Sequence, residues 1–302
     1  MNLKTSFYII ASIILILASP SFAQAQGSFP GSDTLSLILP APRLSVGYMF
    51  PAGPTTLNLD IKGGTAGSIK RLTQSYKLQG LWTELAIPIK TPSPLGFEIG
   101  GAYLSSGNNR SYSTKNGVAE RTWRTSTQMC YFQVAATYQI TSSISGILGF
   151  RYDSFMTNFS EPENIVGDSG RLHNADFTFS GEIPFFGIAY SRRFMYGSTV
   201  NTGMIGLPTL PGDLYHRETR ETNNRLSFNN GADSGYFLEA WAGLSYQLTP
   251  LIQVGAFSKY SGVYFKTTGN LSLSQDSASQ YETEATFDRG VWIIAGFVGA
   301  SF

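Results

Sequence analysis

The sequence predicts an all-β protein: a transmembrane, antiparallel, up-and-down β-barrel of about ten strands. The first observation is the final segment, Val291–Phe302, which alternates large apolar residues and ends on an aromatic side chain. The second is an apolar run near the N-terminus, followed by small residues, as in an export signal. The third is composition: 42% of residues are hydrophobic and only 14% charged, yet no later segment is apolar enough to span a membrane as a helix.

The N-terminal segment has the layout of a signal peptide. One basic residue, Lys4, precedes an apolar run over 7–18 and a small-residue segment over 19–23. A membrane anchor is the alternative, but the run is about a dozen residues long, whereas a spanning helix needs roughly 20. The expected organisation is a removed signal peptide at 1–23, an N-terminal periplasmic segment at 24–42 and an outer-membrane β-barrel at 43–302.

The charge balance excludes one class of partner. The sequence has 21 basic and 20 acidic side chains, and removal of Lys4 with the signal peptide leaves 20 of each. A neutral chain has no broad electrostatic field, so we expect no nucleic-acid partner. The single cysteine, Cys130, forms no intramolecular disulfide and lies too far from the cleavage site to carry lipid.

Short turns alternate with longer polar stretches, as in an outer-membrane barrel, where the short turns are periplasmic and the long loops extracellular. The short turns are Thr91-Pro92-Ser93-Pro94, Thr141-Ser142-Ser143, Met195-Tyr196-Gly197-Ser198 and Leu248-Thr249-Pro250. The polar stretches, expected to be extracellular loops, lie near 63–72, 108–124, 159–173, 207–233 and 267–284.

The segments between these turns and loops predict ten strands. Their expected ranges are roughly 43–61, 74–90, 95–107, 125–141, 144–158, 174–193, 199–207, 234–248, 251–266 and 286–302. Two points stay open. The strand at 199–207 is short and contains Gly203, and the first strand is interrupted by Pro51 and Pro54, which would form a further turn and raise the count.

Alternation along the strands predicts which side chains face lipid and which face the lumen. The expected lipid faces are Cys130-Phe132-Val134-Ala136-Tyr138-Ile140, Ile144-Gly146-Leu148-Phe150-Tyr152, Phe177-Phe179-Gly181-Ile183-Phe185, Tyr236-Leu238-Ala240-Ala242-Leu244-Tyr246, Ile252-Val254-Ala256 and Trp292-Ile294-Gly296-Val298-Ala300-Phe302. The expected lumen charges are Glu84, Glu98, Arg151, Asp153, Glu182, Glu239 and Lys259.

These lumen charges carry both signs, so we expect them to pair across the barrel and close it. A barrel of about eight strands is already filled by its own side chains, and aqueous channels need roughly sixteen. A narrow transport barrel is therefore the alternative to a closed lumen.

Three stretches resemble omptins, the ten-stranded outer-membrane proteases: residues 181–188, residues 235–250 and the Phe302 ending. The likeness in strand order and loop pattern extends over most of residues 43–302. It implies an omptin-like barrel in the outer membrane of a Gram-negative bacterium, with outer-membrane lipid and lipopolysaccharide as partners. The last strand looks like the C-terminal signal of outer-membrane barrels, so the barrel assembly machinery is a further expected partner through Phe302.

The resemblance also suggests where to look for catalysis. Omptins are thought to cleave peptides beside basic residues with a water held between an acidic pair and an Asp-His couple. The segment 108–124 contains only Glu120 as an acid, so the acidic pair is missing. Asp213 and His216 lie near the position of the couple, with a spacing longer by one residue. We expect a non-catalytic barrel that acts through its extracellular loops; an omptin-type endopeptidase using Asp213 and His216 is the alternative.

The loop at 108–124 is the best candidate for binding. Arg110, Arg121, Trp123 and Arg124 would meet lipopolysaccharide phosphates or an acidic partner, because arginine suits planar anionic groups. The alternative is an ordinary polar rim with an interfacial tryptophan. The two histidines lie in different loops and no His/Cys/carboxylate cluster has metal-ligand spacing, so we expect neither metal nor cofactor.

Overall fold

The structure is a computed structural model that describes most of the chain from residue 41 onward. The described ranges are 41–52, 55–63, 69–90, 94–115, 118–164, 172–194, 197–208, 212–220, 225–231, 234–273 and 276–302. The expected signal peptide, 1–23, and nearly all of the segment 24–42 lie outside these ranges.

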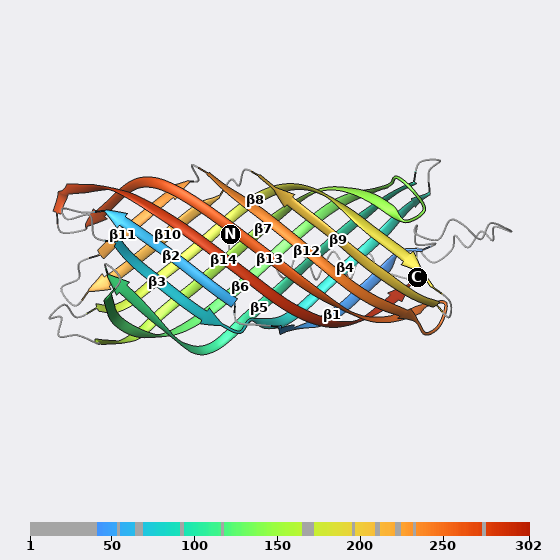
Figure 1. Ribbon diagram of the computed structural model, residues 1–302, viewed down its shortest axis with the longest axis horizontal. Helices are drawn as coiled ribbons and strands as arrows, with labels where there is room; N and C mark the ends of the chain where they lie inside the picture. Colours follow the sequence, from blue (N-terminus) through green and yellow to red (C-terminus); the bar gives the residue numbers. More distant parts are fainter. Residues whose placement is uncertain are drawn as a thin grey trace.

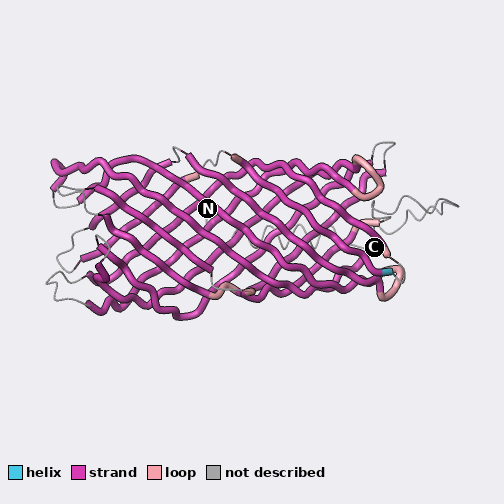
Figure 2. The backbone as a smooth tube through the Cα atoms, in the orientation of Figure 1, coloured by secondary structure: helices cyan, strands magenta, loops and turns pink. Residues whose placement is uncertain are grey.

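The described chain folds into one closed antiparallel sheet of 14 strand segments (Figures 1 and 2). The segments are β1 (Arg43–Pro51), β2 (Thr55–Gly63), β3 (Ile69–Tyr76), β4 (Gln79–Lys90), β5 (Pro94–Lys115), β6 (Val118–Gln139), β7 (Ile144–Asn164), β8 (Leu172–Arg193), β9 (Ser198–Leu207), β10 (Asp213–Arg220), β11 (Arg225–Gly231), β12 (Ser234–Gln247), β13 (Ile252–Leu273) and β14 (Asp276–Ser301).

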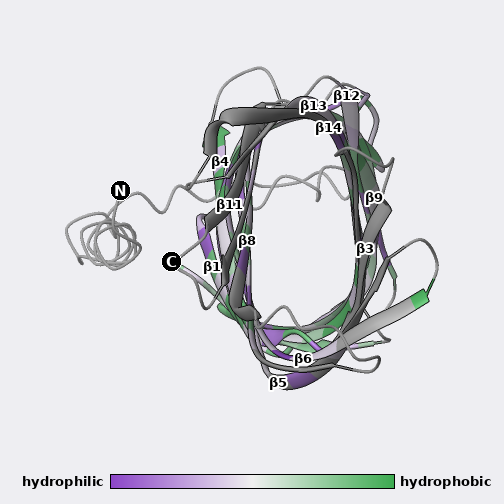
Figure 3. Cartoon of the chain, turned by 90° about the vertical axis from the view of Figure 1, so that its left-hand side faces the viewer, coloured by the Kyte–Doolittle hydropathy of each residue, from purple (hydrophilic) through white to green (hydrophobic). Residues whose placement is uncertain are grey.

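Pairing reduces these segments to ten barrel strands, as predicted. β1 and β2 both pair with β14, β3 and β4 with β5, β9 and β10 with β8, and β11 and β12 with β13. Each couple therefore forms one interrupted strand. The ring closes because β14 also pairs with β13. Seen along its axis, the sheet is a complete ring with no free edge (Figure 3).

The proline-rich interruption of the first strand does not raise the strand count, because the described segments on both sides of it pair with β14. Pro51 lies opposite Ile293 of β14, and Thr56 lies opposite Gly290. More residues separate Pro51 from Thr56 than separate their partners, so the register shifts between β1 and β2, which pair with the same neighbour. Proline has no N–H to donate to the ladder, which explains why the pairing breaks here.

The strands are longer than predicted, and this corrects the loop assignments. β5 continues to Lys115 and β6 begins at Val118, so most of the expected loop at 108–124 is a paired hairpin. The stretches near 63–72, 159–173, 207–233 and 267–284 also carry strand over much of their length. The part of a barrel that extends beyond the membrane has water outside it, so its strands need no apolar face. The polar composition of these strand ends therefore did not distinguish them from loops.

The predicted turns at 141–143 and 248–250 are present at the end of the barrel where the chain finishes, whereas residues 91–93 and 195–196 of the other two lie outside the described residues (Figure 1). We call this end of the barrel the short-turn end. In the turn before β7 the Thr141 hydroxyl accepts the backbone N–H of Ile144, and Thr249 does the same for Ile252 before β13. Gly197, before β9, has a φ of 77°, which explains a glycine at that position.

The outer surface carries the apolar band predicted for the final strand and for most of the other faces. Trp292 is 54% exposed and Val298 56%, and Leu148, Phe150 and Leu244 are exposed on other strands. A band of this kind is stable against lipid, not water. Among the described residues, no helix is both long and apolar enough to cross a membrane.

One predicted lipid face is reversed. Phe177, Phe179, Ile183 and Phe185 of β8 are buried inside the barrel, and Glu182 between them is exposed on the outside. The segment 183–188 is apolar at nearly every position, so alternation did not reveal which face of β8 turns inward.

Candidate functional site

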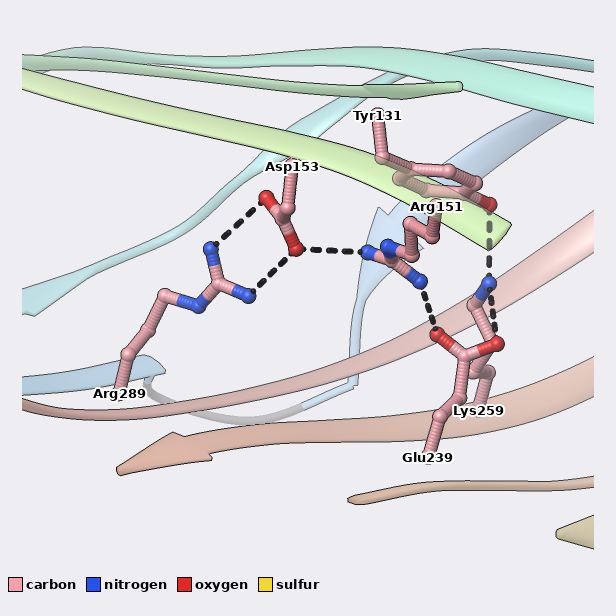
Figure 4. A network of polar contacts seen from close by, with 6 residues as sticks. All are labelled: Tyr131, Arg151, Asp153, Glu239, Lys259 and Arg289. Carbon is pink, nitrogen blue, oxygen red and sulfur yellow. Dashed lines mark hydrogen bonds and ion pairs between the residues drawn. The ribbon is translucent and has the colours of Figure 1, made fainter. Parts of the chain in front are cut away.

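The centre of the lumen holds a buried network of charged side chains (Figure 4). Arg151 Nη1 donates to Glu239 Oε2 at 2.7 Å, and Lys259 Nζ donates to Glu239 Oε1 at 3.0 Å. Lys259 Nζ also donates to the Tyr131 hydroxyl at 2.8 Å. The Arg151 guanidinium lies over the Tyr131 ring, 3.9 Å from its centroid.

Asp153 extends the network to the opposite side of the ring. It accepts from Arg151 Nη2 at 2.9 Å and, through both oxygens, from Arg289 at 3.0 and 3.2 Å. Arg151, Asp153 and Arg289 are completely buried. The network therefore links β7 to β12, β13 and β14 across the lumen, with each buried charge facing an opposite charge.

An aromatic layer lies beyond the network, on the side away from the short turns. Phe179 stacks on Phe287 at 5.1 Å and meets Phe265 edge-on at 5.5 Å. Phe177 also stacks on Phe287, and Phe155 meets both rings. All five rings are fully buried. The lumen is thus crossed by two successive layers, one ion-paired and one aromatic.

A cavity of ≈ 660 Å³ occupies the lumen between the network and the short-turn end. Its wall includes Glu239 and Lys259 of the network and reaches Gly197, Pro250 and Ser301 near the short turns. The cavity is therefore closed on one side by the ion-paired layer and approached from the short-turn end.

The structure separates the seven predicted lumen charges into three groups. Four of them meet in the network: Arg151, Asp153, Glu239 and Lys259. Glu84 and Glu98 lie on the cavity wall. Glu182, whose side chain is exposed, corrects the prediction because β8 turns its other face inward.

Sequence reasoning missed two members of the network, Tyr131 and Arg289. The sequence contained a signal for both residues. Tyr131 alternates with the outward-facing Cys130 and Phe132, and Arg289 shares the inward face of β14 with the buried Phe287 and Val291. An arginine at an inward position predicts a lumen partner, so the alternation of β14 carried a usable signal.

Asp213 and His216, the predicted catalytic residues, both lie on β10. Asp213 is exposed and lies opposite Ser180, whereas His216 is paired in the ladder with Phe177, an inward position of β8. The register is regular between them, and residues three apart on a strand belong to opposite faces. A base and the group that orients it require hydrogen-bond distance, which this spacing opposes.

The four predicted binding residues lie in different environments. Trp123 is buried and packs edge-on against Phe159, so it belongs to the interior rather than to a binding rim. Arg124 is exposed and lies directly opposite Arg110 in the ladder of β5 and β6. Arg121 lies opposite Ser113 on the same hairpin.

Metal chemistry has no centre within the described ranges. There, no group of three or more His, Cys, Asp or Glu side chains could hold a metal ion. Cys130 is partly buried on the outward face of β6. The candidate site therefore consists of the closed lumen, its cavity and the barrel wall at the end opposite the short turns.

The fold and this lumen define a class: a ten-stranded outer-membrane-type β-barrel with a filled centre. No protein-family profile and no curated protein matches the chain. Among solved structures, the outer membrane protease OmpT from Escherichia coli superposes with a TM-score of 0.62 at 12% identity, covering 90% of this chain and 100% of that chain. The architecture is thus omptin-like, and at this identity the likeness establishes the fold alone.

Two other barrels align over similar lengths with lower scores. The translocator domain of the autotransporter NalP from Neisseria meningitidis has a TM-score of 0.37 at 11% identity, covering 99% of this chain and 98% of that chain. The outer membrane protein OprG from Pseudomonas aeruginosa has a TM-score of 0.33 at 11% identity, covering 87% and 96%.

Proposed function

We propose that this protein is a closed outer-membrane β-barrel without protease activity that acts as a binding protein through its extracellular wall. The observation that carries the proposal is the ion-paired layer across the lumen, because a barrel closed at its centre favours binding over passage of solutes through it. The exposed apolar band supports membrane insertion. Short turns belong on the periplasmic side of such barrels, so the opposite end is the extracellular wall.

The proposed ligand is an anionic group, with the phosphates of lipopolysaccharide as the partner. Arg110 and Arg124 lie directly opposite each other on β5 and β6, toward the extracellular end. Guanidinium groups bind phosphate through paired hydrogen bonds, so two arginines at opposed positions of the ladder suit such a group.

The absence of protease activity is supported by two observations. The 108–124 segment has no acidic pair, and the register of β10 opposes an Asp213–His216 couple. The fold shared with a protease does not replace these groups, because a fold hosts many functions and the chemistry belongs to the site.

The binding test uses the refolded barrel in detergent micelles. We expect Arg124→Gln to weaken lipopolysaccharide binding about tenfold, the loss appropriate to one charge-assisted contact. Arg192→Gln is the matched control, because Arg192 is exposed near the short-turn end. Equal affinities of the Arg124→Gln and Arg192→Gln proteins would contradict the proposed site.

The activity test uses a fluorogenic dibasic peptide with lipopolysaccharide present. We expect no cleavage by a barrel whose folding is shown by heat-dependent gel mobility. Cleavage that disappears in Asp213→Ala or His216→Ala would establish the endopeptidase alternative and overturn the non-catalytic proposal.

A further inference from the structure

The cavity at the short-turn end is not explained by a surface-binding function. Its volume of ≈ 660 Å³ lies within the usual range of ligand sites. The ion-paired layer closes its inner side, so a small molecule would enter and leave from the periplasm. Its chemistry identifies the class of molecule.

Glu84, Glu98 and Gln133 present acceptor oxygens at the cavity wall. Glu84 and Glu98 line the wall, and neither forms a hydrogen bond or ion pair within the described part of the chain. They occupy diagonal positions on β4 and β5, since Glu84 lies opposite Gly100, so the two carboxyl groups are near neighbours. The Oε1 atom of Gln133, also on the wall, is buried without a hydrogen-bond partner.

Two cations on the wall donate to other groups, although Arg43 Nε has no hydrogen-bond partner and Arg193 also lines the cavity. Lys259 donates to Glu239 and Tyr131, and Arg43 donates from Nη1 to Gln253 at 2.6 Å. Lys259 forms its ion pair with Glu239 rather than with Glu84. A ligand that supplies an N–H donor and a positive charge would satisfy these carboxylates.

Aromatic side chains complete the wall. Trp82 meets Phe257 and Phe297 at ring-centroid distances of 5.1 and 5.9 Å, and all three line the cavity together with Trp241. Trp82 precedes Glu84 by two residues, so both side chains belong to the inward face of β4. Aromatic rings beside carboxylates suit an organic cation with an apolar body, through cation–π and apolar contact.

We propose that the periplasm-facing cavity binds an organic amine: a primary ammonium group held by Glu84, Glu98 and Gln133, joined to an apolar group that packs on Trp82, Phe257 and Phe297. Basic and acidic residues on the wall balance, so recognition depends on contact rather than on a long-range field. A bare divalent cation fits less well, because it favours six or more oxygen ligands and gains nothing from the rings.

The test is calorimetric titration of the refolded barrel with 2-phenylethylamine, alongside its neutral counterpart 2-phenylethanol. We expect saturable binding of the amine and at least tenfold weaker binding of the alcohol, the factor that one charged hydrogen bond supplies. This comparison uses the natural sequence alone. Equal binding of the two compounds, or no saturable binding of the amine, would overturn the proposal.

Substitution then locates the site. We expect Glu84→Gln and Glu98→Gln each to weaken amine binding about tenfold. Glu182→Gln is the matched control, because Glu182 is a carboxylate on the outer face of the same barrel. If the two cavity variants bind the amine as the control does, the amine occupies some other place and the assignment is wrong.

Discussion

At the scale of single residues, Asp153 has the most demanding position. It is the carboxylate that faces both Arg151 and Arg289, and all three side chains are fully buried. Removal of one partner from a buried ion pair leaves an uncompensated charge. We expect Asp153→Ala to lower the free energy of unfolding by about 3–5 kcal/mol, measured by urea unfolding of the refolded barrel.

The control for this prediction is an ion pair near the surface. Lys266 Nζ lies 3.0 Å from Glu284 Oε2, and the two side chains are 38% and 31% exposed. We expect Lys266→Ala to change the free energy of unfolding by less than about 1 kcal/mol, because water screens the pair. A similar loss in both variants would mean that burial adds nothing and that the lumen network is not what holds the centre together.

At the scale of the element, β8 allows a test of face assignment within one strand. Phe179 is buried and contacts Phe265 and Phe287, whereas Phe186 is 59% exposed on the outer surface. We expect Phe179→Ala to cost about 3–5 kcal/mol of unfolding free energy, as for other buried rings, and Phe186→Ala to cost clearly less. Urea unfolding checks both. A larger loss for Phe186 would restore the orientation first predicted from the sequence.

The same strand shows where sequence reasoning stopped. The strand count, the turns at 141–143 and 248–250 and the outward face of β14 follow from alternation and turn residues, because lipid imposes a regular apolar face. The inward face of β8 could not be predicted in this way, since Phe185 and Phe186 are equally apolar. Only the aromatic layer inside the barrel distinguishes them. Pairing across the lumen, such as that of Asp153 with Arg289, depends on the curvature of the closed ring. The alternation of residues along a strand gives no information about that curvature.

At the scale of the whole molecule, the two layers predict a barrel that does not conduct ions. We expect no discrete conductance steps from the natural protein in a planar lipid bilayer. Phe287→Ala should also stay closed, because the ion-paired layer formed by Arg151, Glu239 and Asp153 still crosses the lumen. Raising the salt concentration should not open either protein, since ions screen buried pairs only weakly. Steps from the natural protein would instead show a continuous path and favour the narrow transport barrel.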